Sequence, residues 1–146
     1  MADPKPPWWL KPLNKVLMTA MKIGLMKDGP PVLTVTGRKS GRARSTPITP
    51  FEVDGQRYVV GGFPGADWVR NVQARPDAVL VRGKVHEPVR MVELTAEQAR
   101  PLLRQFPVLV PTGVSFMKTA GLVTGPDPDE FEALAGRCSV FRFDTV

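Results

Sequence analysis

The feature that most constrains this fold is a series of short β-branched and aromatic segments joined by tight turns rather than by helices. Asp54-Gly55 separates two such segments, and Gly83-Lys84 separates two more. Both pairs are typical of the two-residue turns that connect antiparallel strands. Hairpins in succession, without alternation of strand and helix, argue against a doubly wound parallel sheet. The sequence therefore predicts an α+β fold in which a mostly antiparallel sheet curls into a small barrel.

Six strands are expected in this sheet, over residues 32–36, 45–53, 56–62, 79–82, 87–94 and 139–143. The second contains Pro47 and Pro50, which place it at a sheet edge or a bulge because proline cannot donate a ladder hydrogen bond. Apolar periodicity and a Thr95–Gln98 capping box predict flanking helices. They are expected over residues 11–27, 66–74, from 95 onward, 112–123 and 127–134. Pro101 should kink the third of these or delay its start.

The 146 residues suit one domain, with residues 1–10 as a proline-rich extended lead-in and residues 11–27 as an amphipathic N-terminal helix. One cysteine and one histidine leave no basis for an internal disulfide or a multi-ligand metal site, so no metal is expected. With no signal peptide or apolar span in the sequence, the expected location is the cytoplasm.

Positive charge is concentrated at the start of the chain. Residues 1–51 contain nine Lys or Arg against two Asp, a net of +7, although the whole chain carries only +6. Such a local excess favours an anionic partner: a cofactor phosphate, a nucleic acid or a lipid headgroup. Trp8, Trp9 and the basic helix 11–27 also leave open a weak peripheral contact of residues 8–27 with an anionic membrane.

The segment Gly37-Arg-Lys-Ser-Gly-Arg-Ala-Arg44 is the strongest candidate binding motif. Its glycines let backbone amides converge, while arginine and lysine form charge-assisted bonds with phosphate oxygens. It lacks the order of a P-loop. From the residues alone, a solvated basic turn between strands remains an equal alternative.

Trp68 and Asn71 follow a glycine-rich segment, Gly61 to Gly65. A tryptophan can pack against a flat ring system, and an asparagine amide can recognise a carbonyl or a phosphate. A core tryptophan beside a helix-surface asparagine is the simpler alternative and stays open. No nucleophile or carboxylate pair suggests a catalytic side chain, so no catalytic residue is assigned.

Together these segments resemble the deazaflavin-dependent nitroreductase family, the coenzyme F-420-dependent oxidoreductases with an FMN-binding split β-barrel-like fold. The likeness lies in Leu33 to Pro47, which is similar to the family's Thr-Gly-Arg-Lys-Ser-Gly-x-x-Arg-x-x-Pro signature, in Gly65 to Val72, and in the run of strands from Val32 to Leu94. This resemblance implies a split barrel and a reductase that uses coenzyme F-420.

By that resemblance, the basic loop would hold the cofactor's phosphate and acidic tail, and the other segments would line its ring. The residues implied for the cofactor are Arg38, Lys39, Ser40, Gly41, Arg44, Thr46, Pro47, Gly61, Gly62, Phe63, Trp68 and Asn71. In the region where some family members carry substrate-site tyrosines, this chain has Val114, Phe116 and Met117 as its expected acceptor pocket.

The implied reaction is hydride transfer from reduced coenzyme F-420 to a planar activated acceptor: a quinone, a conjugated lactone or enone, or a nitroaromatic. Two alternatives remain: a split-barrel oxidoreductase that uses FMN, and a non-catalytic protein that binds the cofactor or an anionic surface. The expected partner is a small molecule rather than nucleic acid, and the chain is expected to be a monomer or a homodimer.

Overall fold

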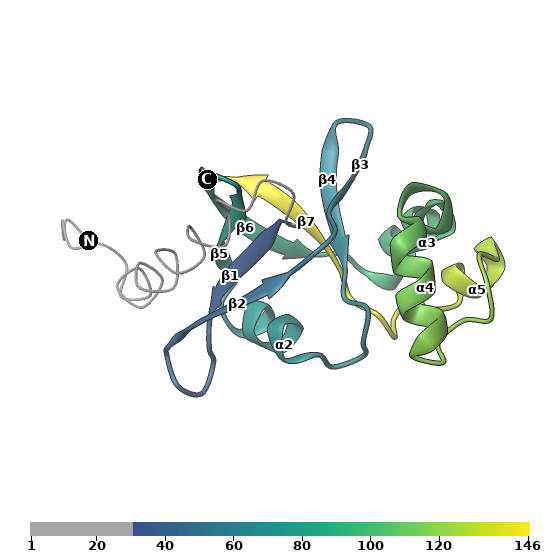
Figure 1. Ribbon diagram of the computed structural model, residues 1–146, viewed down its shortest axis with the longest axis horizontal. Coiled ribbons are helices and arrows are strands. Elements are labelled where there is room, and N and C mark those ends of the chain that lie inside the picture. The colour runs from purple at the N-terminus through teal and green to yellow at the C-terminus, as the bar shows by residue number, and fades with distance from the viewer. Residues whose placement is uncertain (1–30) are drawn as a thin grey trace.

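The computed structural model describes residues 31–146, and these form an antiparallel sheet with helices beside it (Figure 1). The strands are β1 (Val32–Thr36), β2 (Ala43–Pro47), β3 (Phe51–Val53), β4 (Gln56–Val60), β5 (Asp77–Arg82), β6 (Val85–Glu93) and β7 (Val140–Thr145). The helices are α2 (Asp67–Ala74), α3 (Ala96–Leu109), α4 (Pro111–Thr119) and α5 (Pro128–Glu132). The expected lead-in 1–10 and helix 11–27, with the expected membrane contact, lie outside the described residues.

The strands pair in the order β2-β1-β5-β6-β7-β4-β3, and neighbouring strands in this sheet are antiparallel. This confirms the curled antiparallel sheet expected from the hairpins. The expected strand 45–53 is wrong as one element, because it divides into β2 and β3 on either side of Ile48 to Pro50. These two strands form opposite edges of the sheet. Pro47 ends the edge strand β2, and Pro50 lies between the two strands.

The β3–β4 turn has the geometry that its sequence predicts. Asp54 and Gly55 have φ values of 51° and 78°, the left-handed pair required by a type I′ turn. Val53 pairs with Gln56 and Phe51 with Tyr58, so the register follows directly from this turn. The second expected hairpin is also present, with Arg82 opposite Val85 around Gly83.

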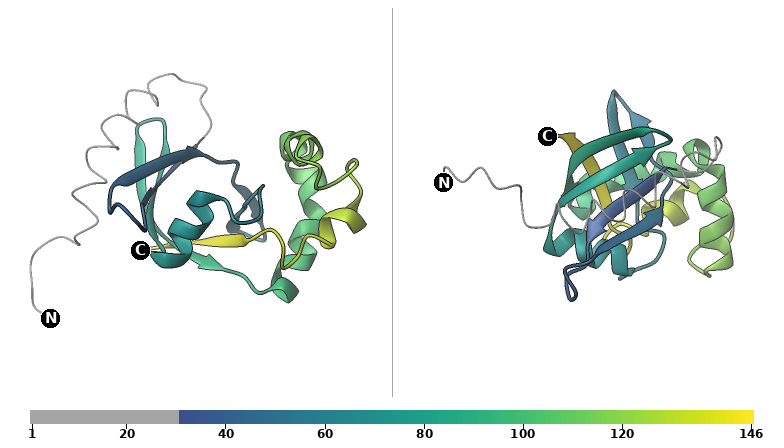
Figure 2. Two further views of the ribbon diagram at one scale, coloured as in Figure 1. Left: turned by 90° about the horizontal axis from the view of Figure 1, so that it is seen from below. Right: turned by 60° about the vertical axis from the view of Figure 1, so that its left-hand side comes forward.

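Two apolar clusters attach the helices to the sheet. On one side, Val69 and Val72 of α2 pack with Leu33 and Val35 of β1. On the other side, α3, α4 and α5 pack their apolar sides together in a cluster that contains Leu103 of α3 and Phe131 of α5. These three helices gather at one end of the molecule, while α2 lies near the β1–β2 connection (Figures 1 and 2). A groove between the two helical groups is therefore built from segments far apart in the sequence.

Helix α3 begins where its capping box predicts. The Thr95 hydroxyl accepts from the Gln98 amide, and the Gln98 side chain accepts from the Thr95 amide. Pro101 lies inside the helix and does not delay its start, contrary to that part of the expectation. The capping box fixes the first turn ahead of the proline, and the buried face of Ala99, Leu102 and Leu103 continues through it.

Within residues 31–146, no helix combines the length and the apolar character that crossing a bilayer requires.

Candidate functional site

Two adjoining clefts lie between the β1–β2 connection, α2 and the C-terminal helices. One, of about 450 Å³, is lined mainly by the basic loop and by the start of α2. The other, of about 430 Å³, is lined mainly by apolar side chains from the segment after β2, from β4 and from α3 and α4. Thr46 and Trp68 line both clefts, so an elongated ligand can occupy the two together.

The basic cleft is built on the loop between β1 and β2, which closes on itself. The Gly37 amide donates to the Arg42 carbonyl at 2.7 Å, and the Gly41 amide donates to the Gly37 carbonyl at 2.9 Å. Gly41 has a φ of 69°, a left-handed conformation that glycine adopts without strain. A Cβ on Gly37 would lie 2.9 Å from the Ser40 hydroxyl oxygen and 3.1 Å from the Arg42 carbonyl oxygen, so any side chain there would crowd the turn.

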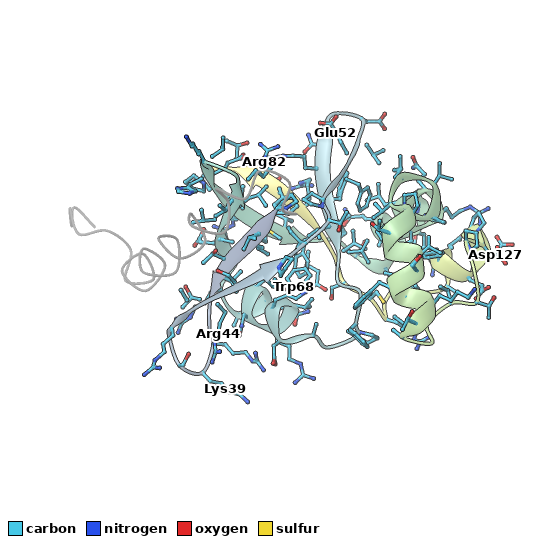
Figure 3. The ribbon with its side chains drawn as sticks, viewed as in Figure 1. Lys39, Arg44, Glu52, Trp68, Arg82 and Asp127 are labelled. Atoms are coloured by element: carbon cyan, nitrogen blue, oxygen red, sulfur yellow. The ribbon has the colours of Figure 1, made fainter. Side chains whose placement is uncertain are left out.

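Lys39 and Arg44 supply the cleft's exposed cations. Figure 3 shows Lys39 on the β1–β2 connection and Arg44 on β2, with Trp68 on the neighbouring part of the molecule. Among residues 31–146, neither forms an ion pair, whereas Arg38 pairs with Asp67 at 3.4 Å. Arg42 belongs to the same loop but lines neither cleft. The chemistry of this cleft is suited to an anion.

Asn71 is buried in α2 and is not the surface asparagine that the simpler alternative supposed. Only 5% of it is exposed, and its Oδ1 accepts from both the backbone amide and the guanidinium of Arg38, at 3.0 and 2.8 Å. Trp68 is half-buried, with its ring 5.8 Å from that of Phe141. The tryptophan thus has one side in the core and still lines both clefts.

The apolar cleft is lined by both aliphatic and aromatic side chains. Pro47 and Ile48 enter from the crossing between the two sheet edges, and Phe106 enters from α3. Phe63 and Phe116 meet edge to face, with ring centroids 5.3 Å apart, and about half of each is exposed. A Cβ on Gly62 would lie 2.7 Å from the Phe116 ring, so glycine is required for this close approach.

Most of the side chains expected at the site from the sequence line one cleft or both. Arg38, Lys39, Ser40, Arg44 and Asn71 line the basic cleft, Thr46 and Trp68 line both, and Pro47, Gly62, Phe63, Phe116 and Met117 line the apolar cleft. Gly41, Gly61 and Val114 line neither. Gly41 shapes the loop, the Gly61 amide donates to the Ser139 carbonyl, and Val114 packs against the core around α3.

Other lining residues were missed by the sequence analysis. Gly37, Ser45 and Asp67 complete the basic cleft. Ile48, Thr49, Val59, Val60, Ala66, Phe106, Val110, Thr112 and Gly113 complete the apolar one. Gly37 and Ser45 lie within the family-like segment Leu33 to Pro47, so that segment already contained both residues. The α3–α4 residues have no local motif that distinguishes them from core or surface.

Cys138 takes no part in either cleft. It is 2% exposed, and burial raises the pKa of its thiol.

A deazaflavin cofactor with an anionic tail fits this arrangement. A flat ring needs an apolar slot beside an aromatic face, and the apolar cleft and Trp68 provide both. A phosphate needs cations and hydroxyls, which Lys39, Arg44 and Ser40 provide next to that slot. The two chemistries are contiguous, as one molecule carrying both groups requires.

Comparison with known proteins agrees with the geometry. The profile of the F420H(2)-dependent quinone reductase family matches residues 16–124, more than half of the chain. No curated protein matches the sequence. A solved F420-H2 dependent reductase is 26% identical, with a TM-score of 0.53, and the alignment covers 79% of this chain and 94% of that one.

Two further solved structures show the fold. A pyridoxamine 5′-phosphate oxidase-related, FMN binding protein from Nostoc punctiforme is 12% identical, with a TM-score of 0.59, over 99% of this chain and 84% of that one. A protein described as a domain-swapped dimer is 24% identical, with a TM-score of 0.54, over 91% and 99%. The split barrel is thus confirmed, and the chain belongs to the F420H(2)-dependent quinone reductase family, as a coenzyme F-420-dependent oxidoreductase.

Proposed function

We propose that this reductase binds coenzyme F-420 with the phosphate and acidic tail in the basic cleft and the deazaflavin ring in the apolar cleft, against Trp68. The acceptor is a quinone, a conjugated lactone or enone, or a nitroaromatic. The observation that carries the proposal is the junction of the two clefts at Thr46 and Trp68. When bound in its reduced form, the cofactor supplies the hydride.

The chain's own residues bind and orient in this scheme. Lys39 and Arg44 grip the anionic groups, and Ser40 adds a hydroxyl donor. Thr46, Pro47, Gly62 and Phe63 line the apolar cleft and would contact the ring. Packing the ring among these side chains excludes water and fixes the face presented to the acceptor.

The acceptor lies beside the ring, against the apolar side chains Phe116 and Met117 of α4. The lining hydroxyls of Thr46, Thr49 and Thr112 are available to hydrogen-bond an acceptor oxygen. None of these hydroxyls is acidic near neutral pH, so we assign the proton that completes the reduction to water.

Cofactor choice tests the proposal first. A tail with several negative charges gains more from Lys39 and Arg44 than the single phosphate of FMN does. We expect coenzyme F-420 to bind at least about tenfold more tightly than FMN, a difference of about 1.4 kcal/mol. Fluorescence titration of the protein with each cofactor measures both dissociation constants, and equal values or tighter FMN binding would overturn the proposal.

The choice of acceptor tests the part of the proposal that concerns the substrate. Residues 111–123 contain no tyrosine, so an acceptor there meets apolar side chains and threonine hydroxyls. We expect quinones or conjugated lactones to be reduced faster than nitroimidazoles, as measured by the loss of reduced coenzyme F-420 absorbance across a panel. A nitroimidazole as the best acceptor would contradict this assignment.

Two expectations about larger partners remain predictions. Monomer and homodimer are both open for this chain, and sedimentation velocity distinguishes them. Cell fractionation tests the expected cytoplasmic location. Co-sedimentation with anionic vesicles at low salt tests the weak membrane contact through residues 8–27. Vesicle binding that is unchanged by removing residues 1–10 would contradict a role for Trp8 and Trp9.

A further inference from the structure

Arg38 attaches the basic loop to helix α2 through side-chain and backbone hydrogen bonds. Arg38 gives Asn71 two hydrogen bonds, one from its backbone amide and one from its guanidinium, at 3.0 and 2.8 Å. The guanidinium also reaches the carbonyl and the carboxylate of Asp67, at 3.4 Å each. Both acceptors belong to α2, so the connection joins the loop to a helix that is itself fixed on the sheet.

This arrangement leaves Arg38 differently placed from the other cations of the loop. Its side chain is 22% exposed and is directed at α2, whereas Lys39 and Arg44 are exposed. A guanidinium that already donates to an amide oxygen and faces a carboxylate has fewer donors left for a ligand. The contacts therefore favour an anchoring function for Arg38 over direct binding.

Asn71 accepts the hydrogen bonds of Arg38 from a buried position in α2. A side-chain amide that is 5% exposed is costly to bury unless its polar atoms find partners, and here Oδ1 finds two donors from the loop. Because the loop is also closed by the hydrogen bonds of Gly37 and Gly41, fixing it at Arg38 fixes it as a unit. Asn71 lies one helical turn beyond Trp68, so the same helix sets the positions of loop and tryptophan.

We propose that Arg38 and Asn71 are positioning residues, which hold Lys39 and Arg44 in their binding arrangement before the cofactor arrives. The identity of the ligand in this proposal rests on the function proposed above. Ordering a charged loop at the moment of binding would consume part of the interaction free energy, and a preformed loop avoids that loss. Asn71 thus acts on the cofactor's anionic tail through the loop and not on its ring.

The test compares Asn71→Leu and Arg38→Met with Gln73→Leu, a matched amide-to-aliphatic change on the exposed side of the same helix. Gln73 donates to Glu93 and touches neither cleft. Arg38→Met removes the guanidinium hydrogen bond to Asn71 but keeps the bond from the backbone amide. It therefore weakens the attachment of the loop less, and it serves as the test if Asn71→Leu folds poorly. Each variant is titrated with coenzyme F-420 and with the same deazaflavin cut off before its phosphate. Amide hydrogen exchange over residues 37–44 is measured without ligand.

We expect Asn71→Leu to bind the full cofactor about tenfold more weakly, to bind the truncated deazaflavin within twofold of wild type, and to exchange its loop amides faster. Arg38→Met should show the same pattern to a lesser degree, and Gln73→Leu should match wild type. Equal losses for both ligands would place Asn71 on the ring, and unchanged loop exchange would overturn the positioning role. If wild type binds neither ligand, the proposed function fails, while the exchange comparison still decides the positioning role.

Discussion

At the scale of single residues, the basic side chains from Arg38 to Arg44 differ in whether they line the basic cleft. Lys39 and Arg44 line the basic cleft, and Arg42, between them in sequence, does not. A hydrogen bond to a charged group contributes roughly 1.5–3 kcal/mol, and partial solvation favours the lower end. We expect Lys39→Ala or Arg44→Ala each to weaken coenzyme F-420 binding about tenfold, measured by titration at two salt concentrations.

Arg42→Ala is the control for that prediction, because it removes the same charge from the same loop. It should change binding less than threefold, and thermal melts should show all three variants folded. Wild-type affinity should fall as salt rises, since exposed charges meet an anion. Equal effects at all three positions would mean that the basic residues attract anions through their combined charge and that no position makes a specific contact.

These same residues show what a local sequence can reveal about the site. Glycine and basic residues at close spacing identified the loop, because the geometry that they need is encoded within eight residues. The apolar cleft was recovered only in part. Thr112 and Gly113 reach it from α4 because α3 and α4 pack against β4, and that packing depends on contacts distant in the sequence.

At the scale of elements, α3 contains a proline whose cost to stability can be measured. Pro101 has no amide hydrogen, so it cannot donate to the carbonyl of Glu97 inside the helix. Pro101 is exposed, so its replacement disturbs no core contact. We expect Pro101→Ala to raise the free energy of unfolding by about 1–3 kcal/mol, as measured by urea denaturation.

The matched control is Arg100→Ala, an exposed neighbour in the same helix, which should change stability by less than about 0.5 kcal/mol. A Pro101→Ala protein no more stable than wild type would mean that the helix is already relaxed around the proline.

The capping box predicted the beginning of α3 from four residues, whereas the division of residues 45–53 into β2 and β3 depended on the order of the whole sheet.

At the scale of the molecule, one ion pair links strands that are not neighbours. Arg57 of β4 contacts Glu87 of β6 at 2.7 and 2.5 Å, while its guanidinium carbon lies 5.8 Å from the ring centre of Phe143 on the intervening β7. The hydrogen bonds from Arg57 lower the pKa of Glu87 below its ordinary 4.5, with a further contribution from the charge of Arg82.

A carboxyl group with a lowered pKa stabilises the fold fully above its unfolded pKa, and that contribution is lost as the pH falls through its folded value. We therefore expect the stability difference between wild type and Glu87→Gln to be largest near neutral pH and to shrink below about pH 4.5. Urea denaturation at several pH values measures it. Glu97→Gln, in an exposed pair with Arg100, is the control and should show little difference at any pH.

The place of β7 in the sheet has a consequence for biosynthesis. This strand follows every other strand in the sequence, yet it lies between β6 and β4, and its preceding residue Ser139 receives the Gly61 amide. During translation, the β3–β4 hairpin emerges long before the strand that joins it to β6. The nascent chain therefore carries an unpaired β4 edge until β7 leaves the ribosome. Any agent that shields exposed strand edges would act on this protein before β7 emerges, while β6 and β4 both lack the strand that joins them.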